Sequence, residues 1–417
     1  MKLLAVGDIH LGRPPAALPE DLADRARALG PEAAWRRCVD AAVENRVDAV
    51  LLAGDVVDRG RDFFVGYGEL KSGIEKLAAA GIPTIAVAGN HDTEVLPRLA
   101  GEIEAMHLLG AGGKWESLEL DGVVILGWSF PTPHVYTSPL ESFRMPATKL
   151  PVIGLLHCDR DQAASRYAPV GSAELEAAPV AAWLLGHVHR PDALSGRRPM
   201  GYLGSVTALR ASETGPRGPW LVEVKRKRVK ARQLVLAPLR YETLEIDAES
   251  LAAPDHLFAA ILAAAQERIA QLVRGATAPD ALGLRARLVG RTEFGPELAE
   301  LAAGLTEEGR SFEESGVAVF IQKVEPATLP AIDLEGLADS PDPAGILARD
   351  LLELDNPDSG RRAELIASAR RELEPITESR EFRPLETGLD NGRIADLLIR
   401  AGRIALGRLI AQKGPAE

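Results

Sequence analysis

Five short segments of the chain carry side chains that can bind divalent cations. Their donor groups are carboxylates, imidazoles and one amide, and five of the eight histidines fall inside them. These donors suit hard or borderline divalent ions, and one carboxylate between two ions can bridge them at about 4 Å. The segments are Gly7-Asp8-Ile9-His10, Gly54-Asp55-Val56-Val57-Asp58, Gly89-Asn90-His91-Asp92, Leu155-Leu156-His157 and Gly186-His187-Val188-His189.

Each segment taken alone also has an ordinary structural explanation. An Asp-x-His match, or a Gly-Asp pair after a strand, is most often a turn or a cap. The Gly-His-x-His segment places two imidazoles on the same side of an extended chain, but it also fits a surface loop. The ordinary explanation fails for the ordered set, because every segment directly follows an expected strand. The set therefore predicts a metal centre.

Short apolar runs alternate with amphipathic stretches over the first 200 residues. We expect strands at residues 3–6, 49–53, 84–88, 123–130, 152–157 and 182–186, and helices at 31–45 and 63–80. The early alternation predicts a parallel sheet flanked by helices, and the later runs predict a second, mixed sheet. The expected fold class is therefore α/β, an αββα sandwich of two stacked sheets with outer helices. Loops at the carboxyl ends of the strands then meet at one edge.

The pattern changes after residue 240. Strands expected at 241–248, 283–291 and 316–324, with helices at 255–273 and 296–305, predict a small α+β capping domain. A linker follows at 338–345, and the rest is expected to be helical, with breaks at Pro375 and Pro384. We expect domains at 1–240, 241–335 and 345–417. In the last helix, one apolar face is expected from Ile394, Leu397, Leu398, Ala401, Ile404 and Ala405.

The composition is that of a soluble globular protein, with 46% hydrophobic and 26% charged residues among 417. No apolar run approaches the roughly 20 residues of a membrane helix, so no membrane partner is expected. The few residues before Gly7 are too short for a signal peptide. The two cysteines favour a reducing, cytoplasmic location.

The formal net charge of −12 argues weakly against nucleic acid as a partner, although a local basic patch can suffice. Arg13, Arg59 and Arg61 follow expected metal loops and could meet phosphates. Residues 225–232 form the densest basic run. This run fits a phosphate-contacting surface and, equally, a solvated hairpin with edge-protecting lysines.

The ordered series resembles the calcineurin-like metallophosphoesterase superfamily. The resemblance implies two ions and a hydroxide held between them that attacks phosphorus in line. It makes His91, beside a ligand but not a ligand itself, the proton donor to the leaving group. Asp58 is expected to hold His91 in the required tautomer, or to be a residue at the start of a helix. The implied ligands are Asp8, His10, Asp55 and His189 for one ion, and Asp55, Asn90, His157 and His187 for the other.

Further residues are similar to SbcD-type DNA repair exonucleases, over about residues 1–240. They are Asp8-Ile9-His10-Leu11-Gly12, Gly186-His187-Val188-His189-Arg190-Pro191, Tyr202-Leu203-Gly204-Ser205 and Glu213-Thr214-Gly215-Pro216-Arg217-Gly218. This likeness implies a DNA exonuclease, with endonuclease activity as a further option, that uses two divalent metal ions, Mn²⁺ by preference. It also implies a homodimer and an SbcC-like coiled-coil ATPase docked on C-terminal helices.

Two other functions stay open at this point. Residues 54–60 read like the second motif of protein phosphatases, so a phosphatase or cyclic phosphodiesterase of the same superfamily is the alternative. A non-catalytic scaffold that retains the fold is a third hypothesis. The scaffold predicts lost ligands, and no ligand position is empty in this sequence.

Overall fold

The computed structural model of the chain describes residues 1–226, 228–309, 311–377 and 390–413. Its contacts divide the chain into two compact units. The first unit comprises Met1–Thr243, Ala265–Arg285 and Glu308–Gln322, and the second comprises Leu244–Ala264, Ala286–Glu307 and Lys323–Glu417.

A six-stranded sheet in the first unit has the strand order β13-β12-β1-β2-β3-β4. Its parallel strands are β1 (Lys2–Val6), β2 (Ala49–Ala53), β3 (Thr84–Val87) and β4 (Met106–Leu108). The hairpin of β12 (Trp220–Lys225) and β13 (Arg228–Gln233) adds antiparallel to β1. Strands β1, β2 and β3 confirm the expected parallel sheet, because each is a short apolar run covered on both faces.

A five-stranded sheet in the same unit has the order β11-β10-β7-β6-β5. The parallel members are β6 (Val123–Trp128), β7 (Val152–His157), β10 (Ala182–Gly186) and β11 (Met200–Tyr202). Strand β5 (Trp115–Leu120) pairs antiparallel with β6. This sheet is mixed, as expected.

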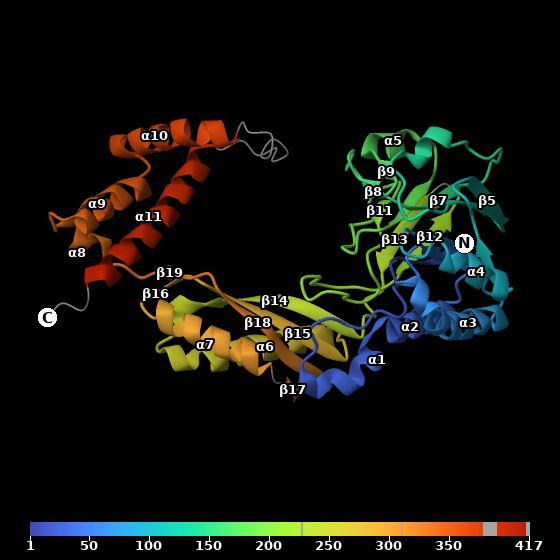
Figure 1. Cartoon of the computed structure of the whole chain (residues 1–417), viewed down its shortest axis with the longest axis horizontal. Coiled ribbons are helices and arrows are strands. Elements are labelled where there is room, and N and C mark those ends of the chain that lie inside the picture. The colour runs from blue at the N-terminus through green and yellow to red at the C-terminus, as the bar shows by residue number, and fades with distance from the viewer. Residues whose placement is uncertain (227, 310, 378–389, 414–417) are drawn as a thin grey trace. The chain divides into compact units, whose positions relative to one another are not determined.

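The two sheets pack face to face. Leu3 and Leu51 from the first sheet share a core with Ile125 and Ile153 from the second. Helices α2 (Pro31–Glu44) and α3 (Phe63–Ala79) cover the outer face of the first sheet, and α5 (Ser172–Ala177) covers that of the second (Figure 1). The expected αββα sandwich is therefore confirmed. Short elements complete this part of the chain: η1 (Glu20–Arg25), α1 (Ala26–Leu29), η2 (Gly60–Asp62), α4 (Val95–Glu102), η3 (Pro139–Ser142), β8 (Asp159–Arg160) and β9 (Pro169–Val170).

A four-stranded sheet follows, in the order β14-β15-β18-β17. It consists of β14 (Leu239–Asp247), β15 (Ala281–Val289), β17 (Ser311–Glu314) and β18 (Val317–Pro326), with helices α6 (Leu257–Arg274) and α7 (Gly295–Glu308) between them in sequence. The expected β-α-β-α-β order is confirmed. Strand β17 was not predicted, because its sequence Ser-Phe-Glu-Glu has no alternation of apolar and polar residues. The remaining short elements are η4 (Ala248–Ser250), η5 (Pro254–His256), β16 (Arg291–Thr292) and β19 (Leu329–Pro330).

The C-terminal part of the second unit is helical. Its helices are α8 (Leu334–Ala338), α9 (Pro343–Asp355), α10 (Gly360–Thr377) and α11 (Asn391–Lys413). The linker expected at 338–345 is shorter, because Asp342 caps α9 by accepting the Gly345 N–H at 2.9 Å. Helix α10 includes Pro375, where a break was expected, and is described as far as Thr377. Pro384 lies outside the described residues. Among the described residues, no helix has the length and apolar content needed to cross a membrane.

Helix α11 packs into the helical core through a face that differs from the expected one. Ile394, Ala395 and Leu406 are buried there, with Leu398 and Ile399 packed beside them. The expected face is wrong in part, since Leu397 and Ile404 remain 49% and 41% exposed. Apolar spacing alone could not choose between two overlapping stripes on one helix.

Candidate metal centre

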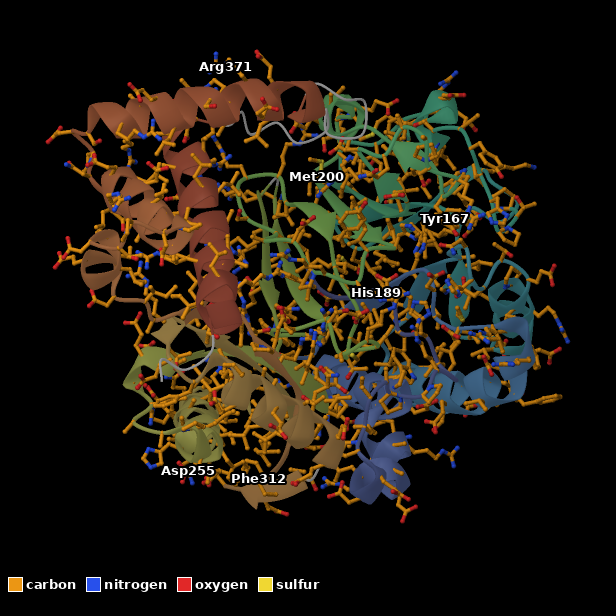
Figure 2. The ribbon with its side chains drawn as sticks, turned by 60° about the vertical axis from the view of Figure 1, so that its left-hand side comes forward. Tyr167, His189, Met200, Asp255, Phe312 and Arg371 are labelled. Carbon is orange, nitrogen blue, oxygen red and sulfur yellow. The ribbon has the colours of Figure 1, made fainter. Side chains whose placement is uncertain are left out.

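The expected ligands lie at the carboxyl ends of strands from both sheets of the sandwich. These strands end at one edge, which explains how residues distant in sequence come together. Figure 2 labels one of them, His189, among the loops of this edge. Asp8 and His10 follow β1, Asp55 follows β2, Asn90 follows β3, His157 ends β7, and His187 and His189 follow β10.

Asp8, His10 and His189 form a first group, whose ligand atoms all lie within 4.8 Å of one another. The Nε2 atoms of His10 and His189 are 3.2 Å apart. Asp8 accepts the His187 N–H through Oδ1 at 2.9 Å, whereas its Oδ2 is buried without a hydrogen-bond partner. A buried carboxylate oxygen without a partner is costly. A cation fits this position, because it would satisfy that oxygen.

Asp55, His157 and His187 form a second group of the same size. Asn90 joins it, since its Oδ1 lies 3.1 Å from both His157 Nε2 and His187 Nδ1. Asp55 Oδ2 is 3.4 Å from His157 Nε2 and 3.7 Å from His10 Nε2, so this oxygen faces both groups. The structure thus brings all seven expected ligands together. Which ion each residue binds stays a prediction.

Three of the imidazoles are held from behind through Nδ1. His157 Nδ1 lies 2.9 Å from the Ala53 carbonyl, which can only accept, so this nitrogen carries the proton. The Nδ1 atoms of His10 and His189 lie 2.9 and 2.8 Å from carboxylate oxygens of Asp58 and Glu213. In all three rings Nε2 is left to face the centre. Such partners fix the tautomer and strengthen the ligand.

Asp58 and His91 lie beside the centre, with contacts that differ from those expected. His91 Nδ1 donates to the backbone carbonyl of Asp58 at 2.9 Å, whereas the Asp58 carboxylate contacts His10. The expectation that this carboxylate orients His91 is therefore wrong, because the side chain turns inward to a buried imidazole. Asp58 also precedes η2 without capping it. His91 is exposed to solvent.

The backbone at four of these residues is left-handed, with φ of +36° at Asp8, +55° at His10, +49° at Asp55 and +104° at His187. Such conformations cost about 1–3 kcal/mol each and persist only where the surrounding fold holds them. Close packing adds a second constraint, because a Cβ at Gly89 would lie 2.2 Å from Oδ1 of Asp55. The strand ends therefore fix the loops tightly.

Opposite charges and burial set the protonation of the centre. Burial acts to raise the pKa of Asp55, but His157 and His10 outweigh it and hold that pKa below its ordinary value. Burial acts to lower the pKa of His157, but the Asp55 carboxylate outweighs it and raises that pKa to about 9. Burial, with the charge on His157, lowers the pKa of His187 to about 3. In the metal-free protein, a protonated His157 therefore balances Asp55 at neutral pH.

Sequence reasoning missed the role of Asp92, which is fully buried. Its carboxylate accepts the N–H of Val56 at 2.6 Å and that of Gly89 at 2.8 Å. It therefore joins the loop after β2 to the loop after β3. No local signal in the sequence marks this role, because the partners are backbone groups.

Sequence reasoning also missed the roles of Glu213 and Arg217, which were used only as a mark of family likeness. Glu213 contacts the ring of His189. Arg217 is buried and donates to the carbonyls of His189 and Glu213. Glu213 lies 24 and Arg217 28 residues beyond His189, and no local pattern in the sequence indicates contacts across this separation.

Arginines lie beside Asp58 at the edge of the centre. Arg13 Nη1 is 3.6 Å and Arg59 Nε is 3.3 Å from its carboxylate, and the Arg59 side chain is 60% exposed. Arg61 instead pairs with Asp62 at 4.0 Å. Two of the three arginines expected to meet phosphates are therefore near the candidate site.

In the basic run at 225–232, Lys225 ends β12 and residues 228–232 lie in β13, which is an edge strand of its sheet. Arg228 and Lys230 are exposed on β13, while Val229 between them is buried. This alternation agrees with edge protection and leaves the cations available to phosphates. Lys227 of this run lies outside the described residues.

Two stretches of the chain match known protein families. Residues 1–191 match the calcineurin-like phosphoesterase family, and residues 241–329 match the middle domain of metallophosphoesterase YhaO. The uncharacterized metallophosphoesterase YhaO of Bacillus subtilis (strain 168) is 30% identical over 241 residues, which cover 54% of this chain and 57% of that protein.

A DNA double-strand break repair protein, Mre11 of Haloferax volcanii, is 27% identical over 256 residues, which cover 59% of this chain and 54% of that protein. The chain thus spans a little over half the length of these two relatives. A solved structure, the calcineurin-like phosphoesterase YfkN from Bacillus subtilis, shares 13% identity at a TM-score of 0.37, covering 66% of this chain and 98% of that chain.

The sandwich, with carboxylates and imidazoles gathered at its strand ends, has the fold and the donor set of the calcineurin-like phosphoesterases. Residues 1–191, which contain all seven expected ligands, belong to the calcineurin-like metallophosphoesterase superfamily. The family uses a dinuclear metal site, and the candidate ligand groups of this chain contain the Asp and His donors that such a site needs.

Proposed function

We propose that this chain is a metal-dependent DNA exonuclease of SbcD type that hydrolyses phosphodiester bonds in DNA repair. The observation that carries the proposal is the convergence of all seven expected donor residues, with an exposed His91 beside them. The choice of DNA is supported by the SbcD-like residues of the first 240 positions. It is also supported by the similarity to Mre11, which is described as a DNA double-strand break repair protein.

The residues of the centre would have three different roles in phosphodiester hydrolysis. The seven donors would hold two ions, which supply positive charge for the phosphoryl oxygens when bound. Arg13 and Arg59 can pair with further phosphate oxygens. The proton for the leaving oxygen would come from His91. Because its Nδ1 already donates to the Asp58 carbonyl, Nε2 can donate only when the ring is doubly protonated.

Further proposals rest on the same likeness. The preferred ion is Mn²⁺, residues 241–335 form a cap that helps to shape the path of DNA, and the active form is a homodimer. An SbcC-like coiled-coil ATPase would dock on the helical region at 345–417, of which residues 378–389 and 414–417 lie outside the described part. Support for docking comes from Leu397 and Ile404 on α11, which remain partly exposed.

One assay separates the nuclease from the alternative. Purified protein with Mn²⁺ is given duplex DNA with blunt and overhanging ends, p-nitrophenyl phosphate, and a cyclic nucleotide. We expect degradation of DNA from its ends and little turnover of the other substrates. The Asp55→Asn variant, purified identically, controls for contaminating nucleases and should be inactive. Rapid monoester or cyclic-nucleotide turnover with intact DNA would instead identify a phosphatase or a cyclic phosphodiesterase.

Docking is tested on the full chain. Substituting Leu397→Asp together with Ile404→Asp should abolish co-purification with the ATPase of the same host while leaving DNA cleavage unchanged. Undiminished co-purification would contradict this docking site.

A further inference from the structure

We propose that Glu213 is a positioning residue for His189 and that Arg217 is the residue that holds both. The inference rests on the proposed metal centre and deepens it, because neither residue is among the seven expected ligands. Its basis is a set of contacts that surrounds a single imidazole from the side away from the centre.

Glu213 reaches His189 directly. One carboxylate oxygen, Oε1, lies 2.8 Å from His189 Nδ1. The other, Oε2, accepts the Leu209 N–H at 2.9 Å and lies 3.4 Å from Ser205 Oγ. The side chain is 12% exposed, so the carboxylate is fixed from two directions. An ionised carboxylate can only accept, so the His189 ring carries its proton on Nδ1. Nε2, 3.2 Å from His10 Nε2, then offers a lone pair to the first group.

Arg217 fixes the loops on both sides of this contact. Its side chain is 2% exposed. Through Nη1 it donates to the His189 carbonyl and, at 2.9 Å, to Ser205 Oγ. Through Nε it donates to the Glu213 carbonyl at 3.1 Å. A planar guanidinium with several fixed donors suits this bridging position better than a lysine would.

The turn that carries Glu213 and Arg217 is anchored to the start of β14. The Gly215 N–H donates to the Tyr241 carbonyl at 2.8 Å, and Thr214 forms an isolated parallel bridge to Tyr241. Ser205, which Arg217 contacts, forms a parallel bridge to Gly7, the residue before Asp8. The pair is therefore tied both to β14 and to the loop after β1. This rigid support is what a positioning role requires.

The partner of His189 Nδ1 is a side chain, the Glu213 carboxylate, so a substitution can remove it. His157 is held by the backbone carbonyl of Ala53, which no substitution removes. Glu213→Gln keeps the shape of the side chain but removes the charge that favours an Nδ1 proton on His189. Loss of such a partner typically weakens metal binding by about 10- to 100-fold.

The experiment measures Mn²⁺ binding by calorimetry and metal content, together with thermal unfolding of the metal-free protein. We expect the wild type to bind two ions. Glu213→Gln should weaken one site by about 10- to 100-fold with the unfolding temperature of the metal-free form unchanged. The matched control is Glu116→Gln, whose carboxylate accepts a backbone N–H from Gly110 at 2.9 Å, and it should bind as the wild type does. Wild-type affinity at both sites in Glu213→Gln would overturn the inference.

A second measurement needs no variant and applies even if Glu213→Gln does not fold. In ¹⁵N-histidine spectra of the Zn²⁺-loaded wild type, His189 should carry its proton on Nδ1 and coordinate through Nε2. Coordination through Nδ1 would overturn the inference, and so would a wild type that binds no ions. A wild type that binds two ions but leaves DNA intact would refute the nuclease and leave the role of Glu213 standing.

Discussion

The role of His91 yields the sharpest test of the proposed chemistry. His91→Ala removes an exposed ring whose one described hydrogen bond goes to the Asp58 carbonyl. Loss of that bond should cost about 0.5–1.5 kcal/mol of stability, so the protein should stay folded. The ring is not one of the seven expected ligands, and the content of bound metal should therefore hardly change.

Activity should respond far more than stability. A positioned general acid contributes about 10²- to 10⁴-fold, which corresponds to about 3–5 kcal/mol of transition-state stabilisation. The loss should depend on the leaving group, because a nitrophenolate leaves readily without a proton and a deoxyribose hydroxyl does not. We therefore expect His91→Ala to lower DNA cleavage by this factor and to lower hydrolysis of bis(p-nitrophenyl) phosphate much less.

The assay compares kcat for both substrates at saturating Mn²⁺, with metal content measured on the same samples. His107→Ala, which removes an exposed histidine on β4, serves as the matched control. Equal losses on the two substrates would refute the role of proton donor. A fall in metal content would show instead that His91 helps to hold an ion.

Other substitutions and conditions test the geometry of the centre. Because a protonated His157, with a pKa of about 9, must lose its proton to bind an ion, apparent Mn²⁺ affinity should rise about tenfold per pH unit from 7 to 9. Calorimetry in buffers of different ionisation heat should detect one proton released as Mn²⁺ binds. If no proton is released, the predicted deprotonation of His157 is wrong. Gly89→Ala should destabilise the protein by about 1–3 kcal/mol and lower metal content, since its Cβ would meet Asp55 Oδ1. Gly68→Ala, with open space around its Cβ, should instead stabilise α3 by about 0.5–1 kcal/mol. Equal unfolding temperatures for the two glycine variants would contradict the steric argument. Asp92→Ala should lower the free energy of unfolding by about 1–3 kcal/mol for each backbone N–H left unsatisfied. An unchanged urea midpoint would argue against its role in joining the loops after β2 and β3.

The sandwich and its donors could be predicted from the sequence because short apolar runs mark the strands and the donors stand at the ends of those runs. Strands β2, β7 and β10 coincide with their expected bounds because each is a short apolar run that ends at a glycine or a ligand. Parallel strands of one sheet end at the same edge, and the face-to-face packing of the two sheets brings the end of β2 beside those of β7 and β10. The positions of Asp55, His157 and His187 therefore followed from one-dimensional information.

The supporting contacts could not be predicted in this way. Whether the Asp58 side chain turns to His10 or to His91 depends on a rotamer, and only the packed site decides it. Glu213 reaches His189 across a turn, without the local periodicity that marks strands and helices. The buried face of α11 was likewise set by its helical neighbours and not by its own spacing.

The left-handed backbone at Asp8, His10, Asp55 and His187 bears on whether metal binding is coupled to folding. In a small zinc domain, binding energy and folding energy are one quantity, and a chelator unfolds the chain. Here one apolar layer on each face of each sheet holds the unfavourable loop conformations before any ion binds. We expect the emptied protein to keep its shape and to reload without refolding, so that metal supply can switch the activity on and off within the lifetime of one molecule.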